Sequence, residues 1–156
     1  MSITSSTFSR DANYVPITTL GLITSKTMVF DGATVNDPGD FNGTGNPATL
    51  FVVTGTVSVN VVGFCTTDLA GAAATIELGV ASSTAALGDQ QTATDVNQHM
   101  SFHDAVLAIG GNVDGHSHVV DENVIQTVGT ANITSGALVY YCWWVPLSTD
   151  GNVVAA

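Results

Sequence analysis

The four histidines are the densest group of possible metal ligands in the chain, at His99, His103, His116 and His118. Four acidic side chains lie within or directly after the same stretch: Asp104, Asp114, Asp121 and Glu122. Spacings of two and four residues would place each histidine pair on one face of a strand, and imidazole and carboxylate groups commonly bind zinc. Polar strand residues beside a loop give the same pattern, and this second interpretation is favoured. We therefore expect no metal, with His116 and His118 as the first ligands to test.

A long loop is expected over residues 31–49, which are dense in Asp, Asn, Gly and Pro. Its oxygen-bearing side chains are Asp31, Asn36, Asp37, Asp40, Asn42 and Asn46. They lack the D-x-D-x-D-G order and the terminal Glu of a helix-flanked calcium loop. Asp and Asn side chains also stabilise turns by bonding nearby backbone, so a turn is the favoured interpretation.

Catalytic motifs are missing from the sequence. It contains no G-x-S-x-G, no H-E-x-x-H and a single lysine. Glu77, Asp104 and Glu122 are candidates for a carboxylate pair only by default, because acids distant in sequence can meet in space. The sequence predicts a protein that is not an enzyme and needs no cofactor.

Charge is scarce and strongly acidic in this chain of 156 residues. Charged residues make up 10%, against about 25% in a typical domain. Arg10 and Lys26 are the two basic residues, and the net charge is -11. Nucleic acid is therefore excluded as a partner, because phosphate binding relies on Lys and Arg. No signal peptide and no apolar stretch of ~20 residues is present, so we expect no membrane contact and a chain made in the cytosol of its producer.

Two cysteines, Cys65 and Cys142, each lie in an apolar run typical of a strand. Neighbouring strands would allow a bridge between them, but free buried thiols are favoured in a reducing compartment. No Cys-x-x-Cys spacing occurs, which leaves thiol redox chemistry and zinc fingers without support.

Period-two alternation is the clearest structural pattern. Val57, Val59 and Val61 alternate with polar residues, and residues 75–80 repeat the pattern with Ile76, Leu78 and Val80 inward. Short strands are also expected within 17–24, 26–30, 99–109, 116–120, 123–129 and 137–147, and a short helical turn within 83–98. These elements predict an all-β protein, a single-domain β-sandwich or jelly-roll-like barrel over residues 17–156. Residues 1–16 form an extended N-terminal arm.

An aromatic cluster occupies five consecutive positions, Tyr140 to Trp144. In a strand, Tyr140 and Cys142 would face one side while Tyr141 and Trp143 face the other. Because both faces are apolar, one is expected to meet the opposite sheet and the other a neighbouring subunit. The predicted oligomer interface is Tyr141, Trp143 and Trp144.

Two segments, TLFVVTGTVSVNVVGFCTTDLAGAAATIELGVASSTAAL and GALVYYCWWVPLSTDGNVVAA, resemble a family of small tailed-phage virion proteins of the head decoration, or cement, type. The resemblance covers roughly residues 48–90 and 122–156, and the matching segments are ones that we expect to form strands. It implies a β-rich virion protein that assembles, often as a trimer, on the outside of an icosahedral head and binds the major capsid protein.

The N-terminal arm carries the expected capsid contacts, with Phe8 and Tyr14 as anchors and Arg10 as a rare cation. The alternative hypothesis is a β-sandwich for host adhesion or carbohydrate binding, in which Trp143, Trp144 or Tyr141 stacks on sugars.

Overall fold

Residues 9–10, 16–17, 22–32, 39–41, 46–103 and 117–156 are described by the computed structural model. Strands account for most of them, and the helical content in this part of the chain is one short 3-10 turn, Ala93–Asp95. The strands are β1 (Ser9–Arg10), β2 (Pro16–Ile17), β3 (Leu22–Phe30), β4 (Asn46–Thr54), β5 (Val57–Ala70), β6 (Thr75–Val80), β7 (Ser83–Thr92), β8 (Ser101–Phe102), β9 (His118–Val120), β10 (Val124–Gly129), β11 (Ser135–Pro146) and β12 (Asn152–Ala155).

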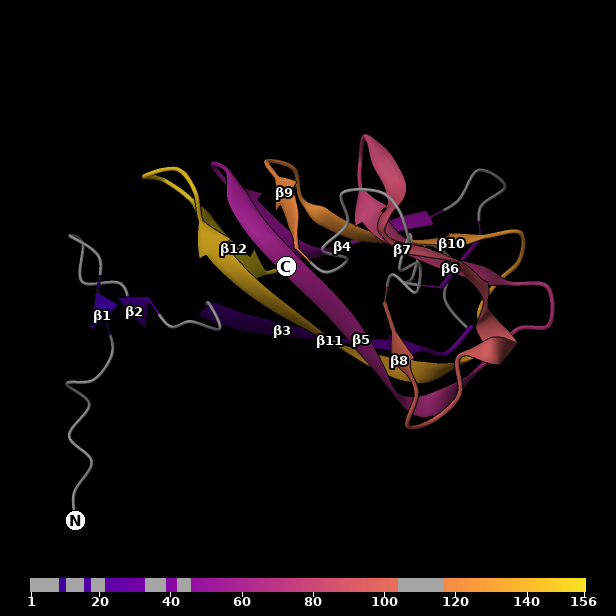
Figure 1. The fold of residues 1–156 in the computed structure, drawn as a ribbon. Helices are drawn as coiled ribbons and strands as arrows, with labels where there is room; N and C mark the ends of the chain where they lie inside the picture. The colour runs from indigo at the N-terminus through magenta and orange to yellow at the C-terminus, as the bar shows by residue number, and fades with distance from the viewer. Residues whose placement is uncertain (1–8, 11–15, 18–21, 33–38, 42–45, 104–116) are drawn as a thin grey trace, which may run out of the picture.

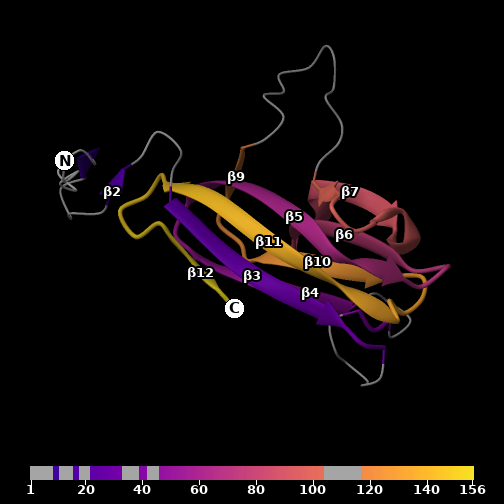
Figure 2. The ribbon, with the colours of Figure 1, turned by 90° about the horizontal axis from the view of Figure 1, so that it is seen from below.

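Two antiparallel sheets face each other to form a sandwich (Figures 1 and 2). The first has the strand order β3-β11-β5-β8, and β9 also pairs with β5. The second has the order β12-β4-β10-β6-β7. No strand is hydrogen-bonded into both sheets among the described residues, so no barrel is closed. The predicted all-β sandwich is confirmed.

The alternating strands bury the side chains that the sequence assigns to the interior. Val57, Val59 and Val61 lie on the inner face of β5, with Cys65 further along the same face. On β6 of the opposite sheet, Ile76, Leu78 and Val80 are buried as expected. Burying side chains of this size contributes about 1.5–3 kcal/mol each, so the core between the sheets is the main source of stability.

One long edge of the sandwich is covered where β12 of the second sheet lies beside β3 of the first (Figure 2). The Thr24 hydroxyl donates to the carbonyl oxygen of Val153 over 3.3 Å, and the Lys26 ammonium group donates to the carbonyl oxygen of Ala156. The strand at residues 152–155 was not predicted from the sequence. These two bonds join β3 of the first sheet to the C-terminal end of the chain in the second.

Two local predictions need correction. The two short strands expected within 17–24 and 26–30 are mainly one continuous strand, β3. The long loop expected over residues 31–49 ends earlier, because strand β4 begins at Asn46. The short helical turn expected within 83–98 is confirmed at residues 93–95, and most of the remaining segment is strand β7, which was not predicted. β7 runs along β6 with irregular register, and the backbone of Ser83 and Thr84 lies directly over Gly79. A residue without a side chain is required there.

Within the arm, Ser9–Arg10 and Pro16–Ile17 pair as a two-residue antiparallel ladder. This pair lies away from both sheets, beyond one end of the sandwich (Figures 1 and 2). The anchors Phe8 and Tyr14 lie outside the described residues, and the side chain of Arg10 is also outside them.

Candidate interaction surface

Strand β11 occupies the centre of the first sheet, where it pairs with β3 on one side and β5 on the other. Its side chains alternate between the two faces, as the sequence predicts. The inward side chains are Leu138, Tyr140, Cys142 and Trp144, and all four are buried. Tyr141 and Trp143 point outward and are half-buried by their neighbours on the same face.

The inner face of β11 is tied to the opposite sheet by one buried hydrogen bond. The Tyr140 hydroxyl donates to Oε1 of Gln126 on β10 over 2.7 Å, and both side chains are fully buried. The amide nitrogen of Gln126 has no hydrogen-bond partner. Burial raises the pKa of Tyr140 well above its usual value, and the nearby Cys65 adds to this shift. The Tyr140 hydroxyl on this face is therefore kept neutral, and its role is structural.

Both cysteines are buried free thiols, as favoured from the sequence. Cys65 lies opposite Leu138, whereas Cys142 lies opposite Val61. The two cysteines are therefore offset by four residues on adjacent strands, about 13 Å along the strand direction, and a disulfide needs Cα atoms within about 7 Å. Burial raises the pKa of Cys142 to about 12, which keeps this thiol protonated and unreactive.

An aromatic row lies on the outer face of the first sheet. The rings of Phe64 and Tyr141 are 5.8 Å apart at an interplanar angle of 73°, and those of Tyr141 and Trp143 are 6.0 Å apart at 35°. Phe64 comes from β5 and remains 42% exposed. Edge-to-face contacts of this kind fix ring orientations in protein interiors and interfaces.

Aliphatic side chains surround this row because cross-strand partners share a face. Val62 lies opposite Tyr141, Val139 opposite Phe64, and Ile23 opposite Trp143. Val29 on β3 and Val145 at the end of β11 extend the patch and are exposed. We call this patch the aromatic face; its members are Ile23, Val29, Val62, Phe64, Val139, Tyr141, Trp143 and Val145.

The aromatic face carries no charge. The other outward positions between its members are Ser25, Thr27, Asn60 and Ala137, and Ser58 and Thr66 lie at its borders. Lys26 belongs to the opposite, inward set of β3 and reaches the end of β12. Contiguous exposed apolar patches often mark interaction sites.

Trp144 does not belong to this surface, which corrects its assignment to the oligomer interface. Its side chain is buried inside the sandwich, and its indole N–H donates to the Thr24 hydroxyl over 3.2 Å. Sequence reasoning also missed Phe64, Val62, Ile23 and Val29. Extending the period-two phase of Val57 to Val61 would have placed Val62 and Phe64 outward.

The histidines do not form a cluster in the described part of the chain. His99 donates its backbone N–H to the carbonyl oxygen of Cys65, whereas His118 pairs with Val59 on the same strand. These positions are six residues apart on β5, about 20 Å. His116 lies outside the described residues, and within them no group of three His, Cys, Asp or Glu side chains is placed to hold a metal ion.

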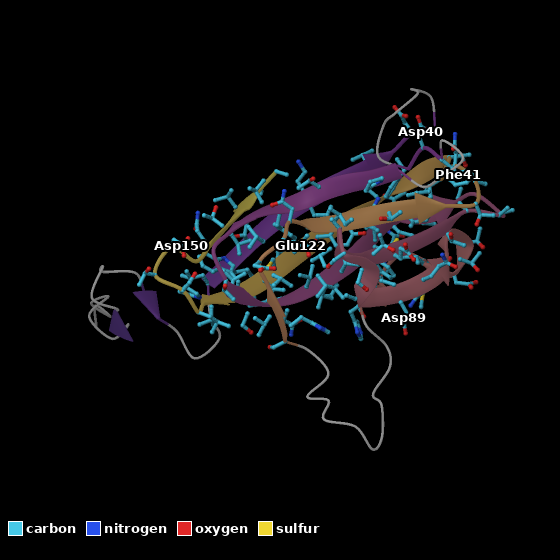
Figure 3. The ribbon with its side chains drawn as sticks, turned by 90° about the horizontal axis from the view of Figure 1, so that it is seen from above. Asp40, Phe41, Asp89, Glu122 and Asp150 are labelled. Atoms are coloured by element: carbon cyan, nitrogen blue, oxygen red, sulfur yellow. The ribbon has the colours of Figure 1, made fainter. Side chains whose placement is uncertain are left out.

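The acidic side chains are also dispersed. Figure 3 shows the side chains of Asp40, Asp89, Glu122 and Asp150 apart from one another. Glu77 lies opposite Thr127, near the start of β6. Glu122 lies near the opposite end of that strand, where its carboxylate accepts a 2.9 Å hydrogen bond from the backbone N–H of Ser82. Hydrogen bonds from the Ser82 side chain and backbone lower the pKa of Glu122. The third default carboxylate, Asp104, and the loop acid Asp37 lie outside the described residues.

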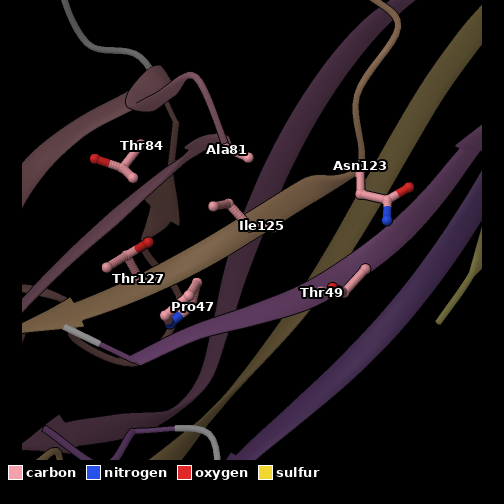
Figure 4. A pocket seen from close by; sticks show the side chains of 7 residues that line it. All are labelled: Pro47, Thr49, Ala81, Thr84, Asn123, Ile125 and Thr127. Carbon is pink, nitrogen blue, oxygen red and sulfur yellow. The ribbon is translucent and has the colours of Figure 1, made fainter. Parts of the chain in front are cut away.

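A cavity of about 400 Å³ lies on the outer face of the second sheet (Figure 4). One wall consists of Ala81 in the β6–β7 turn and Thr84 on β7. The other lining residues come from β4, from β10 and from the position just before β10: Pro47, Thr49, Asn123, Ile125 and Thr127. The volume is within the range of ligand pockets. None of the lining side chains titrates, so this cavity can hold a neutral group but supplies no acid or base.

Comparison with known proteins yields no relative: no family model, curated protein or solved structure matches the chain. The resemblance to head decoration proteins therefore stays a prediction. In the described residues, no helix is of a length and apolarity that would cross a bilayer.

Proposed function

We propose that the protein is a structural component of a tailed-phage virion, a decoration protein that binds the outside of the head as a homo-oligomer and stabilises the shell. Its partners are the major capsid protein and other copies of the same chain. The aromatic face is the observation that carries this proposal, because a contiguous apolar patch of partly exposed side chains favours contact with another protein.

A rigid sandwich with one uncharged face suits such a role. The acidic remainder of the molecule repels DNA and keeps unassembled copies soluble. Assembly by surface complementarity requires no reactive group, and the core groups Tyr140 and Cys142 are held neutral by burial.

The ring geometry disfavours the carbohydrate-binding alternative. A flat platform that stacks one sugar unit on each of several rings would hold those rings close to one plane. Phe64 stands nearly perpendicular to Tyr141, and Trp143 is tilted by 35° from it. Trp144, the other ring considered for stacking, is inside the core.

The arm completes the proposal as the contact to the shell. Residues 1–16 bring Phe8, Arg10 and Tyr14, and Arg10 is one of only two cations on an acidic chain. The β1–β2 pair within this segment lies away from the sandwich (Figure 1). A segment that projects from the folded body can wrap a partner's surface and become ordered on binding.

Co-sedimentation with head shells tests this function. Shells of the parent phage that lack this protein are mixed with the full-length chain or with a variant lacking residues 2–13, and the pelleted protein is quantified. We expect the full-length chain to pellet and the truncated chain to remain in solution with an unchanged circular dichroism spectrum. Equal pelleting would overturn the arm assignment. Failure of the full-length chain to bind any shell would overturn the decoration function.

A further inference from the structure

We propose that the aromatic face is covered by the same face of a second copy, so that the protein is a two-fold dimer with two β3-β11-β5 sheets stacked against each other. This inference rests on the proposed function only in assigning the face to protein contact. It differs from the trimer implied by the resemblance to decoration proteins.

Charge selects this face for self-association. Two copies of a chain with a net charge of -11 repel each other wherever their carboxylates come together. The outer face of the second sheet carries Glu77 on β6 and Asp89 on β7, and Asp121 and Asp150 lie in exposed turns. The aromatic face carries no charge, so here two copies can approach without opposing carboxylates.

Symmetry follows from the number of patches. A two-fold dimer uses one patch that meets itself, whereas a trimer ring requires two different complementary patches on each copy. The aromatic face is one continuous patch on one side of the sandwich. Its strands are antiparallel, and sheets of this kind stack about 10 Å apart with their strands within about 30° of each other.

The size of the patch predicts how tight the dimer is. Three strands spaced about 4.8 Å apart and about nine residues long cover roughly 450 Å² per copy, or about 900 Å² for the pair. That total lies above most crystal-packing contacts, which bury less than about 800 Å², and below the standard 1,200–2,000 Å² of stable complexes. The dimer should therefore dissociate on dilution.

Sedimentation equilibrium across a dilution series tests the inference, with a matched pair of variants. Val145→Glu places a carboxylate on the aromatic face, and Val52→Glu places one on the outer face of the second sheet; both valines are 38% exposed. The wild type and Val52→Glu should show a reversible monomer–dimer equilibrium. Val145→Glu should dimerise at least about tenfold more weakly, since like charges across an interface are strongly unfavourable.

Val29→Glu provides a second test at a more exposed position of the aromatic face. Val29 is 64% exposed, so this change should leave folding intact. It should weaken dimerisation in the same way. A protein that stays monomeric at every concentration, a trimer as the smallest oligomer, or Val145→Glu and Val29→Glu variants that dimerise like Val52→Glu would each overturn the inference. A dimer that fails to bind head shells would instead refute the proposed function and leave this inference standing.

Discussion

The hydrogen bond between Tyr140 and Gln126 links the two sheets across the core, and removing either partner should destabilise the fold. The bond is 2.7 Å long, and neither side chain is exposed to solvent. Tyr140→Phe leaves the Gln126 carbonyl oxygen buried and unpaired, which costs about 1–3 kcal/mol. Gln126→Met leaves the Tyr140 hydroxyl unpaired, but it also removes an amide nitrogen that has no partner, so its cost should be at the lower end of that range.

The double variant, Tyr140→Phe with Gln126→Met, decides whether this reasoning holds. Replacing both polar groups by apolar groups of similar shape is nearly neutral, so its free energy of unfolding should return to within about 1 kcal/mol of the wild type. Denaturant unfolding measured by circular dichroism gives these values, and each kcal/mol should move Tm by about 2–4 °C. Single-variant losses that simply add in the double variant would refute the claim that the two groups act as a pair.

Three further outcomes can be measured in the same way. Gly79→Ala should lower the free energy of unfolding by about 1–3 kcal/mol, because its Cβ would lie 2.2 Å from the Ser83 carbonyl oxygen. Gly129→Ala is the milder control, because its Cβ would meet only a threonine hydroxyl. Equal losses of stability in the two variants would contradict this packing. Gly136→Ala should also destabilise, since φ is +123°; an unchanged denaturation midpoint would contradict it. The free energy of unfolding should fall as pH rises from 9 to 12, because the unfolded Cys142 thiol ionises near 9 while the folded one stays protonated up to about 12; a Cys142→Ala variant with the same slope would exclude this thiol as a cause.

The β-rich fold could be predicted because alternating apolar and polar residues indicate a strand with one buried face. Val57, Val59 and Val61 face the core as their spacing requires, and the same rule separates Tyr140 from Tyr141 on β11. Which face a side chain occupies is a local property of the strand, so it is accessible from a single sequence.

What lies on each face could not be predicted because strand pairing is non-local. The sequence gives no indication that Phe64 would meet Tyr141, since they are brought together by the register of β5 against β11. Trp144 was misassigned because its apolar character fits either face, and only the phase set by Tyr140 and Cys142 places it inward. Strand β7 was not predicted because its Ala, Gly and Asp residues have little strand propensity of their own. Pairing with β6 imposes the strand, and the short helical turn expected in this segment follows it at residues 93–95.

The central position of β11 has a consequence for the order of events during synthesis. β3 and β5 do not pair with each other; β11 lies between them and joins Lys26 to Tyr140, residues far apart in the chain. β10 likewise joins β4 to β6 in the second sheet. Topologies dominated by such distant pairings fold slowly, in roughly milliseconds to seconds. A nascent chain that has not yet released β11 from the ribosome therefore cannot complete its first sheet.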